Sequence, residues 1–179
     1  MRSKNFFLLA LTLTAVLALV VAGPAFAERG DDSDRASKNG MASGTLDGVE
    51  VELTYGRPNV KGRELWGALV PYGKVWRTGA DEATTITFGG DVTVEGEELA
   101  AGSYSLFTIP GEDEWTMIFN EVAEQWGAYD YDEAKDVLRV TVSPQEHEMV
   151  ESMDFAVGDG AVTLMWGELA VPVAIAAAE

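Results

Sequence analysis

The sequence predicts an all-β protein: a single antiparallel β-sandwich, jelly-roll-like, with about nine short strands and one or two short helical turns. Two observations support this prediction. From residue 49 onward, apolar and polar residues alternate with the period of two that a half-buried strand shows. Turn-forming Gly, Pro and Asp residues interrupt this alternation roughly every 8–12 residues. The sequence contains no internal repeat that would indicate a second domain.

The alternation defines the expected strands one by one. In the first, the apolar residues of one face are Val49, Val51, Leu53 and Tyr55. Further strands are expected at residues 86–88, 92–94, 104–109, 115–119, 137–142, 149–157, 162–166 and 169–175. Turns are expected at residues 89–91, 95–97, 110–111 and 158–160, and we expect the first and last of these to close hairpins. Residues 63–69 and 121–126 could each form one or two helical turns.

The first 27 residues predict a cleaved signal peptide. Arg2 and Lys4 precede an apolar run, and Ala25-Phe26-Ala27 has the small-x-small pattern that signal peptidases cleave. We therefore expect cleavage after Ala27 and a secreted or periplasmic protein. An uncleaved membrane anchor is the alternative, because the apolar run is just long enough to span a bilayer. The chain has no Cys, which excludes a lipid-anchored cysteine, disulfides and thiolate metal sites.

The rest of the chain suits one domain, since removal of residues 1–27 leaves about 150 residues. Residues 28–45 are rich in Gly, Ser and charged side chains and have little to bury. This composition predicts a flexible linker. The β-sandwich domain is therefore expected over residues 46–176.

The chain is strongly acidic, with a formal net charge of −18. A negative surface repels phosphate backbones and anionic lipids. We therefore expect neither nucleic acid nor, after signal cleavage, a membrane as a partner. The charge is interpreted as a source of solubility, and the oligomeric state does not follow from it.

Positive charge is concentrated in one segment. Residues 78–134 contain no Lys or Arg, and neither does the chain after Arg139. The clustered cations are Arg57, Lys61, Arg63, Lys74 and Arg77. Such cations could bind a polar or anionic ligand through forked hydrogen bonds. Alternatively, they could pair with Glu64, Asp81 and Glu82 and only hold loops in place.

Tryptophan is abundant, with five residues in the chain. Trp115 and Trp166 follow the strand alternation and are expected in the core. Trp76 and Trp126 lie in turn-like segments, where an indole could stack on a flat ligand.

No motif selects an enzyme class, and no cofactor is expected. The chain has no Gly-x-Ser-x-Gly, no phosphate-binding glycine loop and no His-Glu-x-x-His. Glu82 and Asp81 are weak catalytic candidates as a carboxylate pair. The weak metal candidates, for which a solvated loop is the simpler interpretation, are Asp130, Asp132 and Asp136. His147, the single histidine, is expected at the surface.

Three motifs resemble a known family. They are RPNVKGRELWGALVPYGKVWRTGADEATTITF at 57–88, LAAGSYSLFTIPGEDEWTMIFN at 99–120 and QWGAYDYDEAKDVLRV at 125–140. In order and spacing they resemble the bacterial domain-of-unknown-function family numbered 2911, over roughly residues 46–176. The resemblance implies a secreted or envelope protein, and it brings no catalytic residues because the family has no established activity. The residues at its motif positions are Arg57, Pro58, Lys61, Gly62, Arg63, Trp76, Arg77, Thr78, Gly79, Glu82, Trp126, Gly127 and Tyr129.

These observations lead to the hypothesis of a binding module for a small polar or anionic ligand, such as a sugar or an organic acid. Its pocket would be built by residues 57–63, 76–82 and 125–129 at one end of the sandwich. The expected ligand-binding residues are Arg57, Lys61, Arg63, Trp76, Arg77, Thr78, Glu82, Trp126 and Tyr129. One alternative is a hydrolase of glycans or esters that uses Glu82 with Asp81 or Asp130. Another is a structural or protein-interaction domain of the cell envelope.

Overall fold

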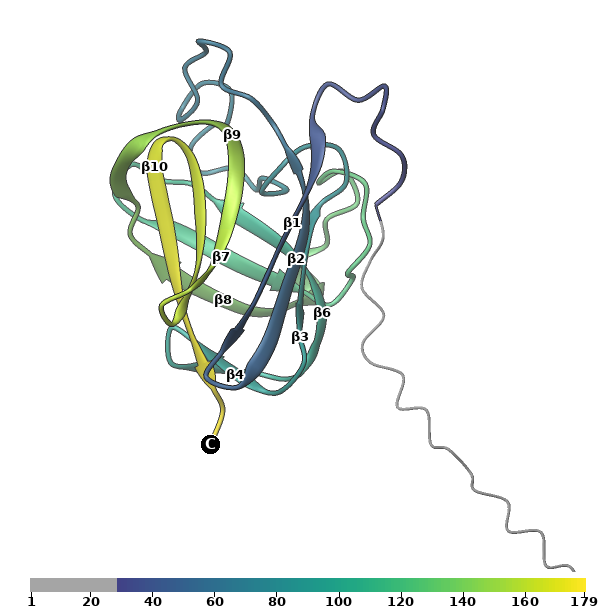
Figure 1. The fold of residues 1–179 in the computed structure, drawn as a ribbon, viewed down its shortest axis with the longest axis vertical. Helices are drawn as coiled ribbons and strands as arrows, with labels where there is room; N and C mark the ends of the chain where they lie inside the picture. The colour runs from purple at the N-terminus through teal and green to yellow at the C-terminus, as the bar shows by residue number, and fades with distance from the viewer. Residues whose placement is uncertain (1–28) are drawn as a thin grey trace, which may run out of the picture.

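Two antiparallel sheets form the domain (Figure 1). The structure, a computed structural model, describes residues 29–179, so the predicted signal peptide lies outside the described residues. One sheet has six strands in the order β1-β2-β3-β6-β7-β8, and the other has four in the order β5-β4-β10-β9. The predicted all-β antiparallel sandwich is confirmed.

The strands are longer at the two ends of the chain than in its middle. The six-stranded sheet contains β1 (Lys38–Leu46), β2 (Val49–Arg57), β3 (Thr84–Phe88), β6 (Gly102–Ile109), β7 (Trp115–Asn120) and β8 (Asp136–Val142). The four-stranded sheet contains β4 (Val92–Val94), β5 (Glu97–Leu99), β9 (Gln145–Gly158) and β10 (Ala161–Ala177). A 3-10 turn, η1 (Glu133–Lys135), precedes β8. Residues 29–179 contain no helix that is long and apolar enough to cross a membrane.

One apolar core fills the space between the sheets. Ile86 and Phe119 of the six-stranded sheet belong to the same buried cluster as Phe155 of the four-stranded sheet. Trp115 and Trp166, predicted in the core, each expose 1% of their surface. Full burial of an aliphatic or Phe side chain contributes roughly 1.5–3 kcal/mol. The face of each strand that carries these apolar side chains therefore packs toward the core.

A cluster of four tryptophans closes one part of this core. Trp76 stacks on Trp166, with 5.8 Å between ring centroids and 20° between ring planes. Trp66 lies edge-on to Trp115 at 4.7 Å and to Trp166 at 5.6 Å. Aromatic pairs of this kind add about 0.5–1.5 kcal/mol beyond the area they bury. The cluster anchors the long loop between β2 and β3, which carries Trp66 and Trp76.

Residues 38–46 form a strand where the sequence predicts a linker. β1 pairs with β2 along its whole length, from Lys38 opposite Arg57 to Leu46 opposite Val49. Its small residues have a packing role: a Cβ on Gly40 would lie 2.5 Å from the Tyr55 ring. Small residues that permit such close approach also resemble linker composition. The expected linker is therefore wrong for residues 38–45, and the sandwich begins at Lys38 rather than at residue 46.

Three further local predictions differ from the structure. Residues 89–91 do not close a hairpin, because they carry the chain from β3 in one sheet to β4 in the other. Residues 63–69 and 121–126 form turns and irregular backbone rather than helical turns. The strands expected at 162–166 and 169–175 are one strand, β10, whose pairing with β9 shifts register on both sides of Gly167. The left-handed φ of Gly167, 62°, breaks the alternation there.

The turns predicted at 95–97 and 158–160 do close hairpins.

Candidate functional site

The turn of residues 76–83 is the frame of the candidate site. Trp76 and Thr108 exchange two backbone hydrogen bonds of 2.8 and 2.9 Å, and Thr84 Oγ1 donates to the Thr78 carbonyl at 2.7 Å. Thr78 and Asp81 have φ values of 53° and 62°. Left-handed backbone at such residues costs roughly 1–3 kcal/mol each and persists only where the surroundings hold it. The surrounding hydrogen bonds therefore hold the turn in this conformation, and it borders two pockets.

The first pocket, which we call the cationic pocket, has a volume of about 300 Å³. Its polar lining includes Asn59, Lys61, Arg63 and Arg77, and its apolar lining includes Trp76 and Trp166. Within residues 29–179, no Asp or Glu side chain lines it. Three cations thus line one pocket with no acidic residue among the described lining residues, in a chain whose net charge is −18.

Arg77 is a half-buried cation that has no ion-pair partner among residues 29–179. Its Nε atom is buried and has no hydrogen-bond partner in the part of the chain that the structure describes. Its guanidinium forms no ion pair with any other residue that the structure describes. A buried polar group left unbonded costs roughly 1–3 kcal/mol. Arg77 is therefore the group whose bonding an anionic ligand would complete.

Lys61 and Arg63 reach the cationic pocket from the loop after β2. The backbone N–H of Lys61 donates to the Glu151 carboxylate at 2.9 Å, and the Lys61 side chain is exposed. The guanidinium of Arg63 donates to the carbonyl of Val60 at 3.0 Å and to that of Asn59. Neither cation forms an ion pair within residues 29–179.

Arg57 has a structural partner instead. Its guanidinium lies 2.8 Å from the Asp154 carboxylate and donates to the Met153 carbonyl at 3.1 Å. The Tyr55 hydroxyl donates to the same carboxylate. Burial, followed by this hydrogen bond, raises the pKa of Tyr55. Arg57 thus ties β2 to β9 across the two sheets, and it does not line the cationic pocket.

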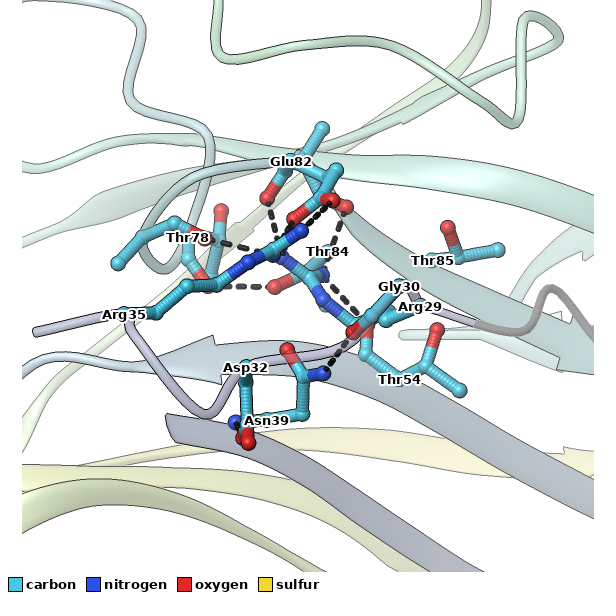
Figure 2. Close-up of polar contacts among 12 residues, drawn as sticks. Arg29, Gly30, Asp32, Arg35, Asn39, Thr54, Thr78, Glu82, Thr84 and Thr85 are labelled. Carbon is cyan, nitrogen blue, oxygen red and sulfur yellow. Dashed lines mark hydrogen bonds and ion pairs between the residues drawn. The ribbon is translucent and has the colours of Figure 1, made fainter. Parts of the chain in front are cut away.

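Two arginines bind Glu82 (Figure 2). Arg35 contacts both carboxylate oxygens, at 2.6 and 2.8 Å, and Arg29 contacts one of them at 2.8 Å. The hydrogen bonds from Arg35, together with the charge of Arg29, lower the pKa of Glu82 to about 2. Glu82 is therefore ionised at neutral pH and has no proton to donate in acid catalysis.

Arg29 is almost fully enclosed, since its side chain exposes only 6% of its surface. Besides Glu82 Oε2, its guanidinium donates to four backbone carbonyls. These belong to Ala80 at 2.9 Å, Glu82 at 3.0 Å, Ala83 at 3.3 Å and Thr54 at 3.5 Å. We call these acceptors the arginine cage. Burial lowers the pKa of Arg29 and Glu82 opposes this effect, so the guanidinium stays charged.

A second pocket of about 290 Å³ lies beside the arginine cage. Trp126 lines it, exposes 56% of its surface and lies under the Arg35 guanidinium, 5.9 Å from its ring centroid. Tyr129 is 85% exposed and lines neither pocket. The structure therefore divides the predicted pocket. Residues 57–63 meet the turn at the cationic pocket, and residues 125–127 meet it at the arginine cage.

The remaining candidates lie outside both pockets. Thr78 is buried, and its hydroxyl contacts the Trp76 carbonyl and the Thr108 hydroxyl. Asp81 is half-buried and lines neither pocket. Asp132 caps η1, and Asp136 accepts hydrogen bonds from Tyr131 and Arg139. In residues 29–179, no three Asp, Glu or His side chains gather where they could hold a metal ion. Asp130 and His147 are exposed.

Arg29 and Arg35 belong to the site although the sequence does not predict them as site residues. Both lie in the segment predicted as a linker, and their partner Glu82 is about fifty residues away in the chain. The available signal is that RGDDSDR places its two arginines on either side of an acidic run. Trp166 is predicted as a core residue and also lines the cationic pocket.

The family model described as "Protein of unknown function (DUF2911)" matches residues 37–175. The chain belongs to the DUF2911 family. The match confirms the resemblance. It begins at the residue before β1 and ends within β10, two residues before that strand ends. No curated protein and no solved structure matches the chain. In this DUF2911 domain, the three cations of the cationic pocket and the acceptors of the arginine cage lie inside the matched residues, whereas Arg29 and Arg35 precede them.

Proposed function

We propose that this DUF2911 domain binds a small organic anion in the cationic pocket. The observation that carries the proposal is Arg77, whose buried Nε has no acceptor within the described residues. Arg77 lies with Lys61 and Arg63 in a pocket that no described acidic residue lines. The chain has 30 Asp and Glu residues with which to neutralise these cations. An anionic ligand would supply the acceptors that those residues do not.

The lining favours a carboxylate or phosphate group attached to an apolar or ring-shaped body. A guanidinium offers a planar fork of N–H donors that matches carboxylate and phosphate oxygens. Trp76 and Trp166 contribute flat apolar surface against which the rest of the ligand can pack. A volume of about 300 Å³ lies at the small end of ligand pockets. Organic acids and acidic or phosphorylated sugars have these properties.

The geometry favours binding over hydrolysis. The hydrolase alternative depends on Glu82, whose oxygens accept hydrogen bonds from Arg29 and Arg35. With a pKa of about 2, Glu82 is not an acid catalyst at neutral pH. A purely structural role fits Arg57, which is paired with Asp154. It does not account for Arg77.

We also propose that the domain works in the periplasm or outside the cell. The support is the pattern of residues 1–27, in which a basic start, an apolar run and Ala25-Phe26-Ala27 follow one another. Sequencing the N-terminus of the protein isolated from its native cells tests this proposal. Glu28 is the expected first residue, and a chain that begins at Met1 would contradict it.

A ligand screen with a charge-matched control tests the binding function. The protein without its leader (residues 28–179) is screened by thermal shift and calorimetry against organic acids, sugar phosphates and inorganic phosphate. We expect at least one compound to raise the melting temperature, and R77A to bind it roughly ten- to a hundredfold more weakly, the usual loss for a charged hydrogen bond. K74A should bind normally, because Lys74 is exposed and lines neither pocket. The absence of any binder, or equal binding by R77A, would contradict the proposal.

A further inference from the structure

The arginine cage has the geometry of a recognition site. Its acceptors come from β2, from the turn before β3 and from the Glu82 side chain, and they converge on one guanidinium (Figure 2). The acceptors are divided between its two terminal nitrogens: Nη1 has the carbonyls of Thr54 and Ala83, and Nη2 has the carbonyls of Ala80 and Glu82 together with Glu82 Oε2. A planar cation with several donors can satisfy acceptors arranged in this way, whereas a compact ammonium presents its three donors on a single atom.

The cage is held together without the arginine. Ala83 N–H donates to the Gln125 carbonyl at 2.9 Å, and Gly127 N–H donates to the Asp81 carbonyl at 3.0 Å. Thr84 N–H donates to the Arg77 carbonyl at 3.1 Å. These bonds fix the turn against the neighbouring loop. The acceptors would therefore stay in place if Arg29 left.

The segment that supplies Arg29 is attached to the sandwich by side chains. The backbone–backbone hydrogen bond found in residues 29–37 is internal, from Arg35 N–H to the Asp32 carbonyl at 2.9 Å. Asn39 at the start of β1 adds contacts to Gly30 and Asp32. The Nε atom of Arg29 is buried and has no partner among the described residues. The segment can therefore leave without breaking a sheet, and its own arginine fits the cage incompletely.

Space remains beside the bound arginine, together with the carboxylate of Glu124, which forms no ion pair within residues 29–179. The 290 Å³ pocket there is lined by Glu82 and Glu124, and Arg29 is the one cation among the described residues that line it. Trp126 offers an exposed indole, on which Arg35 already lies. Arginine packs well on indole faces through its planar guanidinium. Once Arg29 has left, the second pocket therefore suits a cationic ligand, in contrast to the cationic pocket.

We propose that the arginine cage is a binding site for an arginine side chain of another polypeptide, which exchanges with Arg29. The incoming arginine donates to Glu82 and to the carbonyls of Thr54, Ala80 and Ala83. A second arginine nearby in the same segment takes the position of Arg35, over Trp126 and against both carboxylate oxygens of Glu82. This site does not depend on the anion-binding function, since it shares no cation with the cationic pocket.

The test uses the chain's own segment as the probe. A synthetic peptide of residues 28–37 is added to the R29A/R35A variant of residues 28–179, and binding is followed by calorimetry and Trp fluorescence. We expect saturable binding, at least tenfold tighter than to the wild type, where the tethered segment competes at an effective concentration on the order of millimolar. Free L-arginine should bind more weakly than the peptide, because it fills the cage alone. If L-arginine binds as well as the peptide, a small molecule rather than a polypeptide is the ligand and the proposal is overturned.

Three controls make the result specific. A peptide with lysine at both arginine positions should bind at least tenfold more weakly, and E82Q in the R29A/R35A background should abolish binding. R77A in that background should bind the peptide normally, which separates this site from the cationic pocket. If R29A/R35A does not fold, R29K/R35K replaces it and is expected to bind the arginine peptide in the same way. No saturable binding by a folded variant, or equal binding of the lysine peptide, would overturn the proposal.

Discussion

The two pockets beside the 76–83 turn differ in how many acceptors they offer to an arginine side chain. In the arginine cage, Arg29 donates to four carbonyls and a carboxylate. In the cationic pocket, Arg77 has no ion pair within the described residues, and its Nε is buried without a partner. Both arginines are removed from bulk water to a large extent, so the difference lies in what the fold places opposite them. A cluster of charges in the sequence therefore says little until its partners are known.

The largest expected effect comes from Glu82→Ala. This change leaves the enclosed guanidinium of Arg29 without its carboxylate, and loss of one partner of a buried ion pair costs about 3 kcal/mol. Urea denaturation measures the change in the free energy of unfolding. Glu124→Ala is the matched control, because Glu124 lines the same pocket but forms no ion pair within residues 29–179. Equal stability of the two variants would mean that the cage does not stabilise the fold.

A smaller loss of stability is expected from Thr84→Val, a change in the turn that both pockets share. The change removes the hydroxyl that donates to the Thr78 carbonyl at 2.7 Å and leaves a buried acceptor unbonded. We expect the free energy of unfolding to fall by roughly 1–2 kcal/mol, with weaker binding of ligands in both pockets because they share the turn. Thr93→Val on β4, outside the turn, is the control. Normal ligand binding by a destabilised Thr84→Val would show that the turn does not couple the pockets.

The arginine cage also predicts how stability depends on pH. The pKa of Glu82 is about 2 in the folded protein, below its ordinary value of 4.5. A carboxyl group whose pKa is lower in the folded than in the unfolded protein stabilises the fold at pH values above the unfolded pKa. This stabilisation is lost as the pH falls from about 4.5 to 2. The stability difference between the wild type and E82Q should therefore be constant above about pH 5 and shrink below it. Denaturant titrations from pH 7 to 3 measure this difference, and a constant gap would contradict the assignment.

The smallest expected effect is that of Lys61→Ala in the cationic pocket. Its ammonium is exposed, so it attracts an anion through a solvent-screened charge. We expect ligand affinity to fall roughly two- to fivefold, and the difference from the wild type to vanish at high salt. Calorimetry at two salt concentrations measures it. A loss as large as that of R77A would mean that Lys61, and not Arg77, is the main anchor of the ligand.

The sequence predicts the sandwich well because alternation reports which face of a strand is buried. It fails at β1, where Gly40 is required by the close approach of the Tyr55 ring and small residues resemble a linker. The sequence also predicts a single pocket for the clustered cations. In the structure, however, Arg57 pairs with Asp154, and Glu82 pairs with arginines of the N-terminal segment. Pairings between residues about fifty or a hundred positions apart leave no local pattern. They follow from the sheet topology, which the alternation does not specify.

The most direct test of the contrast is a paired measurement of the free energy of unfolding for R29A and R77A in urea without ligand. R29A removes a guanidinium that donates to five acceptors and leaves Glu82 without one of its partners. We therefore expect R29A to lose at least about 2 kcal/mol. R77A removes a cation with no ion-pair partner among the described residues, so its free energy of unfolding should stay within about 0.5 kcal/mol of the wild-type value or exceed it. A loss in R77A as large as that in R29A would show that Arg77 is already paired in the free protein, and the anion-binding function would lose its main support.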